Sequence, residues 1–122
     1  MNKEEIEKVI YAITDVYELL IEVSTDLSHH INNVWCLNLE DLRNKIITAT
    51  QKLETISNTD NHLDLYISEL INITSYLSDT YETSRIEHAR NMLDESIDYL
   101  QKKASFLKMY KDLKKRKSTV GV

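Results

Sequence analysis

The chain has almost no residues that interrupt helices. It contains no proline, and its one glycine is Gly121, next to the last residue. Proline and glycine are the usual residues of tight turns and of sheet proteins. A chain of 122 residues without them, with 29% charged residues, favours long helices joined by short polar links. We therefore expect an all-α protein with a single domain.

Apolar residues recur at 3-4 spacing in four segments, which predicts four amphipathic helices. The expected helices span residues 2–34, 39–57, 61–79 and 85–115. Asn38 with Asp41, and Ser84 with Glu87, predict helix starts because such pairs can satisfy the first backbone amides. The break near residue 80 decides whether the last two segments are separate helices or one continuous rod.

Short links place consecutive helices side by side in opposite directions, so the predicted fold is an antiparallel four-helix bundle with up-down-up-down order. The outer helices, 1 and 4, are long, and the inner helices, 2 and 3, are shorter. We expect residues 1–115 to form this domain and residues 116–122 to form a flexible basic C-terminal tail.

The unequal helix lengths predict a projecting stalk. The start of the first helix and the end of the fourth would lie at the same end of the bundle and extend beyond the inner helices. Two helices cannot cover every apolar side chain of such a stalk, and an exposed apolar patch usually marks an interface. The predicted interface, in a homodimer or with a partner helix, consists of Ile6, Val9, Ile10, Ile13, Phe106, Leu107, Met109, Tyr110 and Leu113. The alternative is shorter helices with frayed ends.

Other aromatic residues and the cysteine refine this view. Tyr11 and Tyr99 lie off the apolar stripes and are predicted to contact a partner, because tyrosine is enriched at interfaces. Trp35 and Cys36 fall in the first link, where we expect them to plug the top of the bundle.

One cysteine cannot form an internal disulfide, and no apolar run approaches the roughly 20 residues of a membrane span. We expect a cytoplasmic protein with no transmembrane segment.

The C-terminal end is basic although the protein is acidic. The whole chain has a net charge of −5, residues 102–117 hold eight basic residues and one acid, or +7, and residues 1–101 therefore hold −12. The predicted basic tail comprises Lys111, Lys114, Lys115, Arg116 and Lys117. Its lysines could neutralise the acidic start of the first helix at Glu4, Glu5 and Glu7. They could instead bind the phosphates of nucleic acid, an acidic protein or an anionic membrane.

No catalytic constellation stands out in the sequence. The four histidines lack the paired Glu-x-x-His motifs of di-iron bundles, and no glycine-rich phosphate loop exists. Acidic clusters around Glu22 and Asp98 match only part of the pattern with which all-helical nucleotide pyrophosphatases hold magnesium. We therefore expect no enzyme activity, no cofactor and no metal.

The predicted function is a non-catalytic interaction module that binds another protein and acts as a helical dimer. Size and charge fit a small intracellular adaptor or inhibitor of the kind that phages and mobile elements encode. Two other functions stay open. One is a nucleic-acid-associated regulator that uses the basic C-terminal end, and the other is a metal-dependent helical nucleotide hydrolase.

Overall fold

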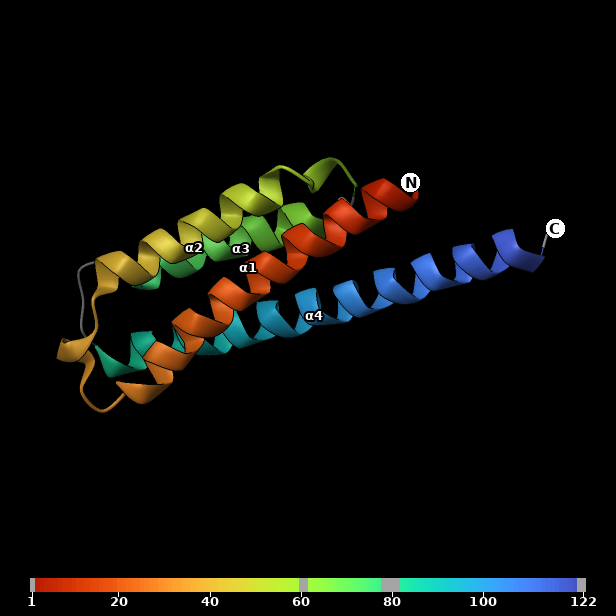
Figure 1. The fold of residues 1–122 in the computed structure, drawn as a ribbon. Coiled ribbons are helices and arrows are strands. Elements are labelled where there is room, and N and C mark those ends of the chain that lie inside the picture. Colours follow the sequence, from red (N-terminus) through yellow and green to blue (C-terminus); the bar gives the residue numbers. More distant parts are fainter. Residues whose placement is uncertain (1, 60–61, 78–81, 121–122) are drawn as a thin grey trace.

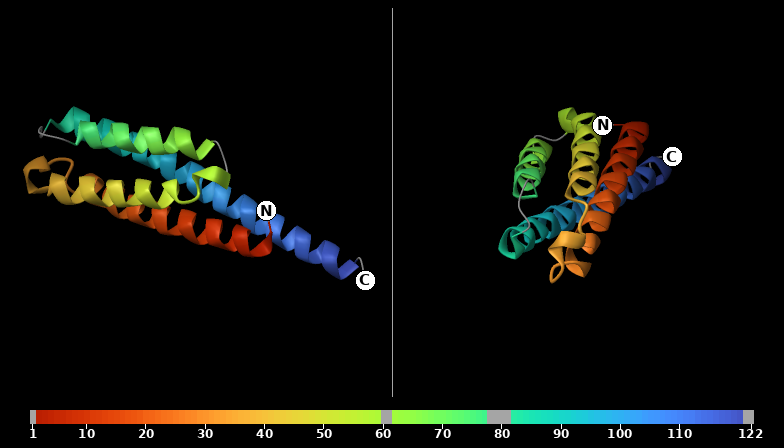
Figure 2. Two further views of the ribbon diagram at one scale, coloured as in Figure 1. Left: turned by 90° about the horizontal axis from the view of Figure 1, so that it is seen from above. Right: turned by 90° about the vertical axis from the view of Figure 1, so that its left-hand side faces the viewer.

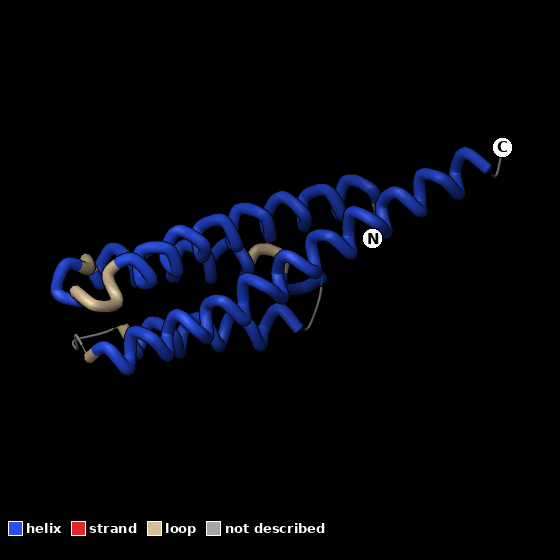
Figure 3. Tube along the Cα trace, turned by 90° about the horizontal axis from the view of Figure 1, so that it is seen from below, coloured by secondary structure: helices blue, strands red, loops and turns tan. Residues whose placement is uncertain are grey.

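The described part of the protein is entirely helical apart from its turns. The computed structural model describes residues 2–59, 62–77 and 82–120, with the side chains in these ranges except those of residues 59 and 114–120. These residues form four α-helices and no strand (Figure 3). The helices are α1 (Lys3–His29), α2 (Leu39–Glu54), α3 (His62–Tyr76) and α4 (Thr83–Val120), with 3₁₀ turns η1 (Val34–Cys36) and η2 (Ser57–Thr59). The predicted all-α class is confirmed.

The four helices form an antiparallel bundle. Each helix packs against the next one in the chain, and α4 also packs along α1 (Figure 1). The outer helices have 27 and 38 residues, against 16 and 15 for α2 and α3, so the predicted inequality of lengths is confirmed. Figure 2 shows that α4 starts beneath α3, crosses toward α1 and projects past the N-terminal end of α1.

One apolar core runs through the bundle and follows the predicted stripes. On α1 it contains Ile6, Val9, Ile10, Ile13, Val16, Leu20, Val23 and Leu27. On α4 it contains Ile86, Ala89, Leu93, Ile97, Leu100, Ala104 and Leu107. Spacings of three and four residues keep each set on one helix face, and burying that face is the main source of stability for helices like these.

The link between α1 and α2 differs from the prediction. α1 ends at His29 rather than near residue 34, and the amide of Asn33 donates to the carbonyl of His30 at 2.8 Å to form a turn. Trp35 is 76% exposed and Cys36 is also exposed, so the expectation that they plug the bundle is wrong. Leu37, which is buried in the core, follows the 3₁₀ turn in extended backbone and fills this end instead.

The helix starts agree with the prediction in one case and differ in another. The side chain of Asn38 accepts a hydrogen bond from the Asp41 amide at 3.0 Å, so this predicted cap is confirmed. α4 starts at Thr83, where the Ile86 amide donates to the Glu82 carbonyl. The Ser84 and Glu87 pair therefore lies inside the first turn. The expected ends of the third helix, residues 61 and 79, lie outside the described residues.

Two arginines satisfy carbonyls at the end of α3. A helix end leaves carbonyl oxygens without intrahelical partners, and glycine usually helps the chain to cap them. Here Arg43 of α2 donates to the Leu77 carbonyl at 2.7 Å, and Arg85 of α4 donates to the Ser75 carbonyl at 3.2 Å. The Arg85 guanidinium also lies 5.5 Å from the centre of the Tyr76 ring. Side chains of two neighbouring helices thus replace the missing glycine cap.

Two adjacent residues of α1 test the assignment of the core. Leu20 is fully buried, whereas Ile21 is 37% exposed. Leu20→Ala is expected to lower the free energy of unfolding by about 2–5 kcal/mol, because it removes buried methyl groups and leaves a cavity. Ile21→Ala is expected to change it by less than about 1 kcal/mol. Urea unfolding followed by circular dichroism measures both, and equal losses would contradict the packing described.

Candidate protein-binding surface

The C-terminal part of α4 carries large apolar side chains that are exposed. Leu107 is the last buried residue of α4 among those whose side chains are described. Beyond and beside it, large apolar groups are exposed. They are Phe106 (66%), Met109 (66%), Tyr110 (40%) and Leu113 (55%), which together form the α4 stripe. Exposed groups of this size on consecutive turns make a continuous patch, unlike single apolar residues scattered over a surface.

The α4 stripe lies on a face of its own. Its members are spaced i, i+3, i+4 and i+7, so at 3.6 residues per turn they fall within about 100° of arc. Ala104 and Leu107, which are buried, point toward the core from the other side of α4. The sequence of this segment therefore contains two apolar lines of 3-4 spacing. One line, with Ala104 and Leu107, belongs to the core, and the other is the α4 stripe.

The α1 half of the predicted stalk lies inside the bundle. Ile6, Val9, Ile10 and Ile13 have exposures between 0% and 8%, and Leu107 of α4 has 7%. The turn η2 lies beside the first turns of α1 (Figures 1 and 2). The expected two-helix stalk with apolar groups exposed on both helices is therefore corrected to one projecting helix, α4. The predicted residues that the structure leaves exposed are those of the α4 stripe.

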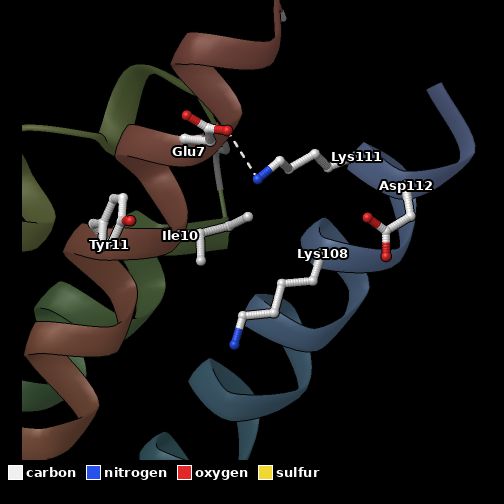
Figure 4. Close-up of a pocket in the computed structure, with 6 residues that line it drawn as sticks. All are labelled: Glu7, Ile10, Tyr11, Lys108, Lys111 and Asp112. Atoms are coloured by element: carbon white, nitrogen blue, oxygen red, sulfur yellow. Dashed lines mark ion pairs between the residues drawn. The ribbon is translucent and has the colours of Figure 1, made fainter. Parts of the chain in front are cut away.

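A groove separates α1 from α4 at the base of the projection (Figure 4). Its volume is about 420 Å³. It is lined by Glu7, Ile10, Tyr11, Lys108, Lys111 and Asp112. In Figure 4 the Ile10 side chain points from α1 toward α4, below the ion pair that bridges the two helices. The groove thus has an apolar floor and charged walls.

An ion pair crosses this groove. The Nζ atom of Lys111 lies 2.8 Å from Oε1 of Glu7, which confirms the expected contact between the basic end and the acidic start of α1 for this pair. The hydrogen bond to Lys111, reinforced by its charge, lowers the pKa of Glu7 below the usual 4.5. The hydrogen bond to Glu7 likewise raises the pKa of Lys111 above 10.5. Both shifts show that the charged forms are favoured together.

The two tyrosines that are predicted to contact a partner differ in exposure. Tyr11 is 72% exposed and lines the groove. Tyr99 is half-buried against the core, and its ring stacks on that of Tyr66 with centroids 4.0 Å apart. Most of the Tyr99 ring is therefore occupied by packing between α3 and α4, whereas Tyr11 presents its ring to solvent.

The basic tail is described only in part. Lys111 forms the ion pair with Glu7, and the α4 backbone continues through residues 114–117 to Val120, beyond the expected helix end at 115. The side chains of Lys114, Lys115, Arg116 and Lys117 lie outside the described ones, so their contacts stay a prediction. Flexibility of residues 116–122 likewise stays a prediction.

The described residues contain neither a metal-ligand cluster nor a helix that could span a membrane. No cluster of three or more histidine, cysteine, aspartate or glutamate side chains in this part of the chain could hold a metal ion. Among the helices of the described residues, none has the length and hydrophobicity needed to cross a bilayer.

Comparison with other proteins adds no relative. No protein-family model, no curated protein and no solved structure gives a significant match to the chain. Functional inference therefore depends on the surface itself.

The ion pair predicts a pH-dependent coupling between α1 and α4. The pKa of Glu7 is lowered in the folded protein by its hydrogen bond to Lys111. Its stabilising contribution is therefore complete above the ordinary value of 4.5 and is lost as the pH falls through the lower folded value. A double-mutant cycle of Glu7→Gln and Lys111→Met, measured by urea unfolding, should give a favourable coupling near neutral pH that disappears in acid. A coupling independent of pH would contradict this assignment.

Proposed function

We propose that the protein is a non-catalytic protein-binding module and that the α4 stripe is its docking surface. The observation that supports this proposal is the exposure of four large apolar side chains on one face of a projecting helix. Full burial of one such side chain is worth about 1.5–3 kcal/mol. A partner that covers the stripe would recover this free energy, which the isolated chain does not.

The composition of the stripe also supports a protein partner. Phenylalanine, tyrosine and methionine are enriched in interface cores relative to the rest of protein surfaces. Residues that dominate binding tend to be large, central and surrounded by a polar rim. Met109 and Tyr110 occupy the middle of the stripe, and Lys102, Lys103 and Asp112 lie beside it along and around α4. The stripe therefore has the features of an interface centre.

Within the same proposal, the protein acts in the cytoplasm as an adaptor or inhibitor. The predicted homodimer has less support than the docking surface, because the α1 residues assigned to the dimer interface are buried within one chain. Binding through α4 needs no second copy. A nucleic-acid role would depend on the basic residues rather than on the stripe, and the two can be separated by mutation.

A charged residue in the stripe should abolish partner binding. Phe106→Asp and Met109→Asp would each force a carboxylate into the apolar interface, at a cost large enough to lower affinity by about tenfold or more. The tagged variants and the wild type would be compared in nuclease-treated lysate of the cells that make the protein. The amount of each captured protein is measured by quantitative mass spectrometry.

The chain offers a matched control for this experiment. Leu65 is 66% exposed, the same value as Phe106 and Met109, but it belongs to α3 and is not part of the stripe. Leu65→Asp should keep the wild-type partner, and circular dichroism should show the same helicity in all variants. Equal capture by the wild type and the stripe variants would contradict the proposed docking surface. Loss of every partner on nuclease treatment would favour nucleic acid instead.

A further inference from the structure

We propose that the occupant of the α4 stripe is an amphipathic helix of another protein, in which acidic turns precede and follow a short apolar stripe. This inference rests on the proposed function and names the partner's chemistry. It follows from the charges at both ends of the stripe and from the length of the stripe. It also follows from the carboxylates of Glu69 and Glu95, which lie where α3 packs on α4.

Basic residues border the stripe at both of its ends along α4. Lys102 and Lys103 precede Phe106 by about one helical turn, and Lys102 pairs with Asp98 at 2.8 Å while its side chain stays 77% exposed. Residues 114–117, Lys-Lys-Arg-Lys, follow Leu113 directly, and the helical backbone carries them onward from the projection. Within 102–113 four lysines and Asp112 give +3, and residues 114–117 add +4. A helix with acids one turn before and one turn after its apolar residues would match this order of charges.

The length of the stripe fits a helix. From Phe106 to Leu113 the stripe extends about 10 Å along α4, or two turns. A partner helix that packs at the usual 8–10 Å between axes can place one apolar stripe of similar length on it. The stripe begins beside the first turns of α1, since Lys108 and Lys111 line the groove with Glu7 and Ile10. A partner helix would therefore lie along α4 on the face away from the buried Ala104 and Leu107, and α4 itself projects past the N-terminal end of α1 (Figure 2).

A second copy of the chain is a poorer occupant than an acidic helix. Pairing two α4 stripes would bring two segments of +7 together. In antiparallel pairing, Lys102 and Lys103 of each copy would face the basic residues after Leu113 of the other. Like charges opposite each other weaken such an interface, and an acidic partner reverses the sign of the same interactions.

An anionic membrane is also a poorer occupant. Glu95 precedes Phe106 by 11 residues, about three helical turns, so it lies on the same face of α4. Beside it, α3 packs on α4 through the stacked Tyr66 and Tyr99, and Glu69 faces the charge of Glu95. A flat anionic surface against the stripe would meet these carboxylates as well. A short helix would contact only the basic, projecting part of α4.

Three labelled helical peptides test the inference. All carry the same apolar stripe in about 20 residues, roughly 30 Å of helix. The turns on each side of that stripe contain glutamate in the first peptide, glutamine in the second and lysine in the third. Fluorescence anisotropy measures their binding to the full-length wild-type protein, to Met109→Asp and to Leu65→Asp. Salt is set at about 0.1 M and about 1 M, where the screening length is about 10 Å and about 3 Å.

The glutamate peptide is expected to bind about tenfold or more tightly than the glutamine peptide at the lower salt, and the lysine peptide most weakly. High salt should reduce these differences. Met109→Asp should abolish binding and Leu65→Asp should leave it unchanged. Equal affinities, preference for lysine, binding retained in Met109→Asp, or no binding of any peptide would each overturn the inference.

Two further measurements distinguish the other occupants. Sedimentation with phosphatidylserine vesicles that is lost in Met109→Asp would assign the stripe to a membrane. A dimer in light scattering that Met109→Asp dissociates would assign it to a second copy, and either result overturns the acidic helix. If capture from lysate depends on the stripe while no peptide prefers glutamate, the proposed function stands and this inference fails. If neither depends on the stripe, both fail.

Discussion

The architecture depends on the burial of one apolar stripe per helix, since removing these side chains from water is the dominant favourable term in folding. A stripe is covered only where neighbouring helices run beside it. α4 has 38 residues, whereas its longest neighbour, α1, has 27. α3, which packs on α4 through Tyr66 and Tyr99, has only 15 residues. Phe106 follows Tyr99 by seven residues, so it continues the face of α4 that α3 covers, and it is exposed. The exposed stripe is therefore a consequence of the difference in length between α3 and α4.

Local patterns predict much of the fold. The number and order of the helices follow from 3-4 spacing, and the Asn38 cap follows from residues three apart, because both depend on near neighbours in the sequence. Exposure depends on contacts between distant segments. The apolar pattern assigns Ile6 and Phe106 to one stalk interface, yet Ile6 is 0% exposed and Phe106 is 66% exposed. The prediction for Trp35 is wrong for the same reason, since the turn that directs it outward is set by the burial of Leu37.

The antiparallel order also determines the electrostatics of the projecting end. It brings the acidic first turns of α1 beside the basic part of α4, where Glu7 pairs with Lys111. The acidic Glu4 and Glu5 in the first turn of α1 also suit the dipole of that helix. Lys102 likewise pairs with Asp98 at 2.8 Å, so at least two of the lysines within residues 102–117 have acidic partners.

The arginine caps of α3 have a consequence for the cooperativity of the bundle. Frayed helix ends usually open on their own, and their amide hydrogens exchange with solvent long before the protein unfolds. At the end of α3 the Ser75 carbonyl accepts from Arg85 of α4, and the carbonyl of Leu77, directly after the helix, accepts from Arg43 of α2. Opening this end requires both neighbours to release it. The shortest helix is thereby joined to the same cooperative unit as its two neighbours.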